Sequence, residues 1–491
     1  MTDEKKIIRG SGGPPKPPPP PYRAPDTLHS RAFATVQDLI SEGEIEGFAS
    51  ASKEGLTKGT TAYDNASLKD VFLDDTPILN SNASSSNPAD TDFNYRDVTF
   101  KSKFGTSNQT AMSGIPAESR SPTGVGAVVE NSDGTDSGGI TGSVTRQITN
   151  TDVDAVIVTL TWPQIQVLED DGDIRGDTVQ YKIQIQHDSG GFVDKITPTT
   201  GGVVSGRTGD AYARDHRIEL TSGFTTVDVR VVRVTADSSS EQRVNAFEFT
   251  SLQEVIDNNS TYPNSAYVAL RLDSKQFNRI PTRKYRIRGI KVRIPGAGAN
   301  NSGTPTVDVQ TGRIIYPSGY IFNGVMGAAV YTNCPSMCLL DLITNTRYGL
   351  GDHVTDSNLD LFSFVAASKY ANTLVDDGTG SGAEEARFSC NVNIQSPKEA
   401  FAAINDLAGV MRCMPIWSAG SITISQDKLT TASYLFNLAN VGEGGFAYSG
   451  SSLKTRHSVV SVSYFNMDSK EVDFEVVEDA TAISKFGTII K

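Results

Sequence analysis

SEGEIEGF, at residues 41–48, is the first of four stretches in which a helix or strand signal is joined to turn residues. The others are YPNSAYVALRLDSKQFNR at 262–279, MCLLDLITNTRYGLG at 337–351 and AGVMRCMPIWSAGSITISQDK at 408–428. Apolar residues recur in them at helical or strand spacing, and Gly, Pro or Asn marks the turns. These stretches say more about the fold than the segments between them.

Composition and charge narrow the class of protein. A chain of 491 residues is too long for one hydrophobic core, so we expect three or four domains. Its 44 glycines, among many Ser, Thr, Asn and Asp residues, predict turn-rich β structure. The net charge of −13 argues against phosphate binding, which needs clustered Lys and Arg. With no signal-peptide run and no apolar stretch of membrane-spanning length, we expect synthesis in the cytosol.

The first 143 residues divide near residue 28. Residues 1–28 contain SGGPPKPPPPPYRAPD, which predicts a Pro-rich flexible arm; a linker is favoured over a ligand for an SH3-like partner. Residues 29–143 predict an N-terminal β domain with long Ser/Asn/Gly-rich loops. It opens on an apolar series at helical spacing, which predicts a short helix ended by Gly43. The series is Phe33, Val36, Leu39 and Ile40.

Repeated two-residue alternation begins near residue 144. Tyr181, Ile183 and Ile185 share one face of a predicted strand. A second strand presents Val227, Val229 and Val231 in the same way. Several short strands with an early Trp predict a fibronectin-III-like β-sandwich, inserted over residues 144–253.

Residues 254–330 predict strands that return to the N-terminal β domain. They include KYRIRGIKVRIP, the most basic run of an acidic chain. Its cations are Arg283, Lys284, Arg286, Arg288, Lys291 and Arg293. A solvated strand face and a contact with acidic residues of a neighbouring subunit both fit this run. DNA binding ranks third, because no aromatic stacking platform accompanies the charges.

The helical signal is concentrated in residues 331–435, for which we predict an α+β domain. Pro335 suits the first helical position before SMCLLDLIT. The sequence Ser396-Pro397-Lys398-Glu399 predicts the start of another helix. Residues 436–491 predict the start of a further β-rich domain. Its alternating side chains, expected to point inward, are Val472, Phe474 and Val476.

Patterns that carry catalysis or metal binding are weak in this sequence. The five histidines lie apart, and no GxSxG elbow is present. The acidic loop LEDDGDIRGD does not fit EF-hand spacing, so we favour a solvated hairpin loop over calcium for Glu169, Asp170, Asp171 and Asp173. Apolar neighbours predict buried reduced thiols at Cys334, Cys338, Cys390 and Cys413. We therefore predict no catalytic, metal or cofactor-binding residues, no cofactor and no enzymatic activity.

The four stretches, in this order, resemble the tip attachment protein J (host specificity protein J) family, the central tail hub of lambda-type siphophages. The resemblance implies β-barrel-like hub domains around the sandwich insertion. It gives structural roles, as core, turn and cap positions, to a set of matching residues, with Arg347 placed to bond the last carbonyls of its helix. They are Ser41, Glu42, Gly43, Ile45, Glu46, Gly47, Pro263, Asn264, Asp273, Phe277, Arg347, Tyr348, Gly349, Met411, Arg412, Cys413, Met414, Pro415 and Trp417.

The resemblance also implies a virion component at the tail tip, made in the host cytoplasm. It implies a homotrimer that closes the tail tube and contacts the distal tail or tail tube protein, the tape-measure protein and small tail-tip proteins. Double-stranded DNA would leave through its lumen without sequence-specific binding. Family members continue beyond KFGTIIK, so we expect receptor-binding parts on a separate chain and only indirect contact with the host outer surface. The alternatives are a receptor- or glycan-binding adhesin that uses the sandwich, and a cell-wall hydrolase.

Overall fold

A computed structural model describes residues 20–132, 141–257, 259–378, 380–396, 398–418, 420–452, 455–466 and 471–489. The chain forms two compact units, Met1–Asp427 and Lys428–Lys491. The predicted class, mainly β with an α+β part, is confirmed, but no sheet of the described residues closes into a barrel. None of the described helices has the length and apolarity needed to cross a membrane.

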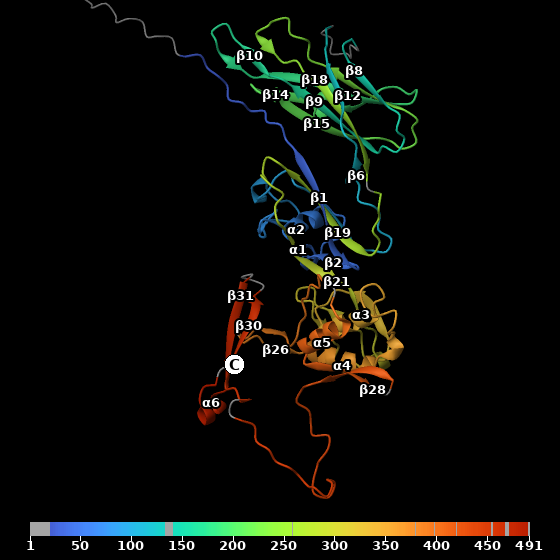
Figure 1. Ribbon diagram of the computed structural model, residues 1–491, viewed down its shortest axis with the longest axis vertical. Coiled ribbons are helices and arrows are strands. Elements are labelled where there is room, and N and C mark those ends of the chain that lie inside the picture. The colour runs from blue at the N-terminus through green and yellow to red at the C-terminus, as the bar shows by residue number, and fades with distance from the viewer. Residues whose placement is uncertain are drawn as a thin grey trace, which may run out of the picture. The chain divides into compact units, whose positions relative to one another are not determined.

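The first element of unit 1 is a three-stranded sheet in the order β1–β19–β5 (Figure 1). These strands span Phe33–Glu42, Ser265–Asp273 and Thr99–Phe104. Central β19 buries Val268, Leu270 and Leu272 in a core that two short helices and smaller strand pairs share. The helices are α1 (Ala49–Lys53) and α2 (Thr61–Leu68). The strands are β2 (Ile45–Phe48) with β21 (Ile287–Ile290), and β3 (Val71–Leu73) between β20 (Arg283–Tyr285) and β4 (Thr76–Pro77).

The predicted helix at residues 33–40 is wrong, because this segment is strand β1. Val36 and Ile40 are four residues apart, a spacing that places them on one side of a strand as well as of a helix. Pairing with β19 along the whole strand, from Phe33↔Asp273 to Glu42↔Ser265, selects the strand. Leu39, expected on the apolar side of a helix, is consequently 65% exposed.

The sandwich consists of two packed sheets (Figure 1). One has the order β13–β12–β16–β8, with β14 on β12. The other has the order β15–β9–β18–β6, with β7 on β18, where β6 spans Pro116–Ser119 and β7 spans Thr123–Val128. Their bounds are Val144–Ile148 (β8), Ala155–Trp162 (β9), Asp177–His187 (β12), Val193–Ile196 (β13), Val203–Gly206 (β14), Tyr212–Glu219 (β15), Val227–Arg233 (β16) and Glu248–Asp257 (β18). A small sheet adds β10 (Gln166–Leu168), β11 (Ile174–Arg175) and β17 (Arg243–Val244). Trp162 is fully buried and stacks on Phe247, 5.0 Å away between ring centroids. The two predicted alternating series are buried as expected.

The sandwich begins before the predicted boundary at residue 144. Strands β6 (Pro116–Ser119) and β7 (Thr123–Val128) both pair with β18. We predicted loops there, since the segment has few apolar residues. Hydrogen bonds to β18, whose own side chains supply Phe249 and Val255 to the core, make it part of the sheet.

Residues 22–30 lie along the sandwich and are called the strap below. Ala24 N donates to the carbonyl of Ile174 (2.9 Å), and Thr27 N donates to that of Arg207 (2.9 Å). The buried Arg207 guanidinium binds the Asp26 carboxylate at 2.6 Å. The described part of the predicted flexible arm is therefore fixed from Tyr22 onward, while residues 1–19 lie outside the described residues.

The remainder of unit 1 is the predicted α+β domain. Its helices are α3 (Pro335–Thr344), α4 (Leu361–Ala371) and α5 (Ala400–Val410). Its strands are β22 (Val292–Pro295) with β25 (Met326–Val330), β23 (Thr306–Val307) with β24 (Ile314–Ile315), β26 (Leu374–Asp376) with β27 (Glu384–Ala386), and β28 (Cys413–Ser418) with β29 (Ser421–Gln426). Val292, Ile294 and Ile314 pack in the core of these helices, so the last predicted return strands belong here.

The two predicted helix starts differ in outcome. Pro335 occupies the first turn of α3, as predicted. The other helix, α5, begins at Ala400 with Glu399 at its N-cap, so Ser396 is not the cap. Pro397, part of that predicted start, lies outside the described residues.

In the part of unit 2 that the structure describes there are one hairpin and one helix. Strands β30 (Val459–Asn466) and β31 (Glu471–Glu478) pair antiparallel, and α6 spans Ala480–Phe486. Both strands were predicted, but the inward orientation of Val472, Phe474 and Val476 is wrong, because all three are exposed. Two strands have no interior of their own, so alternation alone cannot bury a side chain.

Candidate functional site: an interdomain junction

Three of the four informative stretches meet where β1 ends, β19 begins and α3 ends. The Glu42 carboxylate accepts a hydrogen bond from Arg347 Nε through Oε2 and one from Ser265 Oγ through Oε1 (3.3 Å). Arg347 Nη2 also donates to Ser265 Oγ at 3.2 Å. These contacts, between residues more than 80 positions apart, join the β1–β19–β5 sheet to the α+β domain.

Glycine is needed at two positions of this junction. Gly43 has a φ of +108°, and its amide donates to the carbonyl of Asn264 at 2.6 Å. A Cβ there would lie 3.2 Å from Tyr348 Cε1. At Gly105, with φ +83°, a Cβ would lie only 2.5 Å from the Gly43 carbonyl oxygen. Any larger residue at position 105 would push two backbones apart.

The last carbonyls of α3 are not bonded by the Arg347 side chain, contrary to the expectation from the sequence. Backbone amides serve the last carbonyls: Leu350 N donates to Leu342 O at 3.2 Å, and Gly349 N donates to Asn345 O at 3.1 Å. The Tyr348 hydroxyl donates to Asp341 Oδ2 at 2.5 Å, while burial raises the pKa of Asp341. The prediction for Arg347 is therefore wrong, and its side chain reaches Glu42 instead.

The basic run of β20–β22 is neutralised within the chain. Five of its cations bind carboxylates: Arg283–Asp38 (2.5 Å), Lys284–Asp75 (2.5 Å), Arg286–Asp70 (2.7 Å), Lys291–Glu44 (2.7 Å) and Arg293–Asp356 (2.7 Å). The sixth, Arg288, donates to the carbonyls of Val309 and Gln310. The sequence leaves water and a neighbouring subunit open as partners of this run, whereas in the structure the acidic residues that bind it belong to the same polypeptide.

Two of these carboxylates are shielded from solvent, Asp38 partly and Asp70 completely. Asp38 binds both Nε and Nη2 of Arg283 and accepts the Tyr285 hydroxyl at 2.6 Å. The hydrogen bonds from Arg283 hold the pKa of Asp38 below its usual value. Asp70 is fully buried and accepts from Ser50 N (2.5 Å) and Arg286 Nε (2.7 Å). Burial nevertheless raises the pKa of Asp70.

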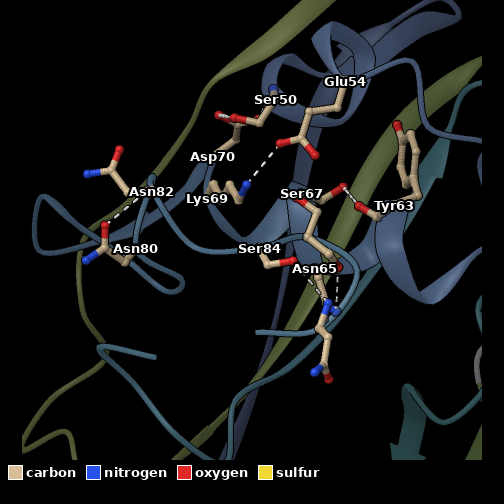
Figure 2. Close-up of polar contacts among 12 residues, drawn as sticks. Ser50, Glu54, Tyr63, Asn65, Ser67, Lys69, Asp70, Asn80, Asn82 and Ser84 are labelled. Atoms are coloured by element: carbon tan, nitrogen blue, oxygen red, sulfur yellow. Dashed lines mark hydrogen bonds and ion pairs between the residues drawn. The ribbon is translucent and has the colours of Figure 1, made fainter. Parts of the chain in front are cut away.

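Further polar contacts surround Asp70 on α1 and α2 (Figure 2). The buried Lys69 reaches from the end of α2 to Glu54, 2.9 Å away, which Figure 2 shows as a dashed line. Ser67 Oγ donates to the carbonyl of Tyr63 at 2.8 Å. Each of these groups is satisfied by a neighbour, which fits a structural role better than a reactive one.

The acidic loop holds the only group of carboxylates in the described residues that is close enough to share an ion. Ligand atoms of Glu169, Asp171 and Asp173 lie within 4.8 Å of one another. Arg175 lies 3.2 Å from Glu169 Oε2, and Asp173 accepts the amide of Tyr22, in the strap, at 2.7 Å. Asp171 accepts the amide of Asp173 at 3.0 Å, so contacts within the chain already occupy all three carboxylates.

The cysteines follow the prediction of reduced thiols. All four are free; Cys334 and Cys390 are buried, and Cys338 and Cys413 are half-buried. Cys334 Sγ lies 3.1 Å from both Ser368 Oγ and Asn372 Nδ2. Burial raises the pKa of Cys334, which keeps it a protonated, weakly nucleophilic thiol.

The fourth stretch contributes a surface as well as a core. Met411 is fully buried, but Met414 and Trp417 on β28 are each 66% exposed. Neither of these two residues is a core position, because among the described residues β28 pairs only with β29 and its outer side has no cover. Arg412 turns the chain at φ +56° and binds Asp427 at 2.9 Å.

The other residues implied by the resemblance serve packing and turns. Ile45 is buried, and Gly47 (φ +137°) has no room for a Cβ beside the Tyr63 hydroxyl. Asp273 is fully buried and lies 3.3 Å from Arg31, while Phe277 packs on Tyr95 at 5.1 Å. The sequence interpretation missed Asp38, Asp70, Gly105 and Ser265. For the two aspartates the available signal was the acidic composition of residues 38–75 opposite a later basic run.

Comparison with known proteins agrees with this architecture. Residues 122–258 match a family model described as the FNIII-A domain of tip attachment protein J. The chain is 32% identical over 444 residues to tip attachment protein J of Escherichia phage SECphi4, covering 90% of this chain and 34% of that protein. It is 29% identical over 424 residues to the tip attachment protein J of Escherichia phage SECphi27, covering 86% and 32%.

These matches place the chain among phage tail-tip proteins. The predicted resemblance to the tip attachment protein J family is confirmed, and so is the fibronectin-III-like sandwich. The chain spans about a third of the length of the curated relatives it matches. Among solved structures, the receptor binding domain of spike protein P1 from bacteriophage PM2 aligns at a TM-score of 0.19 and 15% identity, over 28% of this chain and 93% of that one, which is too low to carry an argument.

Proposed function

We propose that the chain is a structural hub of a phage tail tip, assembled from three copies around a hollow axis. In this role it closes the distal end of the tail tube and holds the host-attachment parts. Its neighbours are the distal tail or tube protein, the tape-measure protein and small tip proteins. The observation that carries the proposal is apolar surface in both units for which the described residues offer no cover.

In unit 1 this surface lies on α5 and the β28–β29 hairpin. Large apolar side chains that a monomer would bury stand exposed there. They are Phe401, Val410, Met414, Ile416 and Trp417. Trp and Met are enriched at the centres of protein interfaces, which favours a protein partner for this surface.

In unit 2 the β30–β31 hairpin exposes apolar side chains from both strands. A hairpin of two strands is marginal in water unless another surface covers it. The exposed residues are Val460, Val462, Tyr464, Val472, Phe474, Val476 and Val477. Self-association would provide cover for such a hairpin.

The charges support a conduit and not an enzyme. The net charge of −13 repels DNA, which suits a lumen through which DNA slides without binding. At the junction, Glu42 and Arg347 bind each other, and Asp38, Asp70 and Asp356 bind arginines. Groups held in this way are unsuited to proton transfer, so we propose that the junction has no catalytic role.

Sedimentation of the purified chain tests the proposal. We expect a trimer at micromolar concentration and a shift to monomer in the variant Met414→Glu/Trp417→Glu, because two charges would have to be buried without partners. Val193→Glu, a similarly exposed apolar site on the sandwich, is the matched control and should leave the trimer intact. A monomer for the unaltered chain at every concentration would contradict the proposed hub.

A further inference from the structure

Strand β1 is held at its N-terminal side by the sandwich. The strap directly precedes it, and Ala213 N on β15 donates to Ser30 Oγ at 2.7 Å. Asp26 accepts from Arg207 Nη1 (2.6 Å) and from Gly209 N (3.1 Å). The Arg207 guanidinium is buried, so removing Asp26 would leave a charge without its carboxylate.

The C-terminal end of the same strand is held by the α+β domain. Glu42, the last residue of β1, binds Arg347 beyond α3. The next residue, Gly43, fits against Tyr348. A Cβ at Gly206, next to Arg207, would lie 2.4 Å from Thr27 Oγ1, so the strap is packed still more closely than Gly43 against Tyr348.

Between these two ends, β1 has little freedom to adjust. It pairs with β19 from Phe33 to Glu42, with one register shift between Leu39 and Ser41. A one-residue slip would turn every side chain to the opposite face of the sheet. It would also separate Asp38 from Arg283. A displacement at one end must therefore be passed to the other or absorbed at the single bulge.

We propose that β1 is a mechanical link, through which the attachment of the strap to the sandwich and the Glu42–Arg347 junction stabilise each other. Release of the strap loosens the turn after α3, and loss of the junction loosens the strap. The inference rests on these contacts alone and does not depend on the proposed hub function. Through this link, a structural change in the sandwich that releases the strap would also affect the α+β domain.

Hydrogen–deuterium exchange on the full chain tests this link. The variant Asp26→Asn/Ser30→Ala should speed exchange of amides in the strap, and also in residues 345–351, by about fivefold or more. Thermodynamic linkage requires the reverse effect. Arg347→Met should therefore speed exchange in residues 22–30 by a similar factor, although it lies in the other domain.

The matched control is Arg120→Met, which removes an ion pair with Glu254 on the sandwich, away from the strap. It should leave exchange in the strap and in residues 345–351 unchanged. The proposal is overturned if either variant speeds exchange only at its own end of β1. It is also overturned if neither variant changes exchange at the opposite end.

Discussion

A single buried histidine makes the sandwich sensitive to acid. His216 on β15 lies with Nε2 2.7 Å from the Tyr181 hydroxyl, and burial lowers its pKa from 6.5 to about 4. The unfolded chain therefore takes up this proton first as the pH falls. The contribution of neutral His216 to the free energy of unfolding is fully present above pH 6.5. It is lost between pH 6.5 and 4, which lowers that free energy by about 3 kcal/mol.

Urea unfolding of the chain at pH 7 and pH 4.5 checks this expectation. The variant His216→Gln keeps a hydrogen-bond acceptor near Tyr181 but does not titrate. We expect its sandwich transition to shift less between the two pH values than that of the unaltered chain. Equal shifts would show that another group causes the acid sensitivity.

Single residues also show where sequence interpretation stops. Gly43 was singled out by its motif, and its positive φ explains the glycine. Gly105 stands in no motif, yet its Cβ would collide with the backbone of Gly43. A close approach between chain segments 62 residues apart leaves no local pattern, so only the structure reveals it.

At the level of elements, two adjacent residues of β20 form ion pairs that differ in burial. Arg283 and Asp38 are about one-fifth exposed and share two hydrogen bonds. Lys284 and Asp75 are mostly exposed. We expect Arg283→Ala to lower the free energy of unfolding by about 1–2 kcal/mol. Lys284→Ala, on the same strand, should change it by less than about 0.5 kcal/mol.

Chemical denaturation of the two alanine variants measures this difference. Since both replace a long cation on one short strand, changes in strand propensity nearly cancel. Equal destabilisation by both would mean that burial and the paired hydrogen bonds add nothing. Greater loss at Lys284 would reverse the proposed order of importance.

The buried faces of the central sandwich strands could be predicted from the sequence, whereas other elements were harder to predict. The alternation in β12 and β16 gave their buried faces correctly, because a sandwich core lies on one side of each strand. β1 was mistaken for a helix, since its apolar spacing fits both structures and distant β19 decides between them. The carboxylate partners of the basic run lie more than 200 residues upstream, except Asp356, and pairing at such separations cannot be read from one sequence.

For the molecule as a whole, the sandwich boundary has a measurable consequence. A fragment of residues 113–258 keeps β6 and β7, which cover one edge of β18. A fragment of residues 144–253 loses both strands and leaves that edge open to aggregation. We expect the shorter fragment to melt at least about 5 °C lower, by circular dichroism. Equal melting temperatures would show that β6 and β7 are accessory.

Two predicted boundaries differ from the ranges of the elements in the structure, at the strap and at the start of the sandwich. Composition marks where a segment changes character, but a strand with few apolar residues still joins a sheet when a partner supplies the hydrogen bonds. That is why β6, β7 and the strap were assigned to loops or to the arm. Met414, Trp417 and Phe474 are apolar but exposed. An apolar residue in a sequence predicts burial, but it does not indicate whether the same chain or a partner covers it.

The sandwich leaves the β1–β19–β5 sheet and returns to it at adjacent positions. Phe104, the last residue of β5, is the direct partner of Ala266 on β19, a separation of about 5 Å between their Cα atoms. Residues 105–265 are therefore an insertion between β5 and β19, two strands that could be joined directly as a hairpin. Recombining phage genomes could therefore exchange this module as a cassette, if the newcomer accommodates the strap and also the packing of Met112 and Ile115 on Tyr267 and Ala269 of β19.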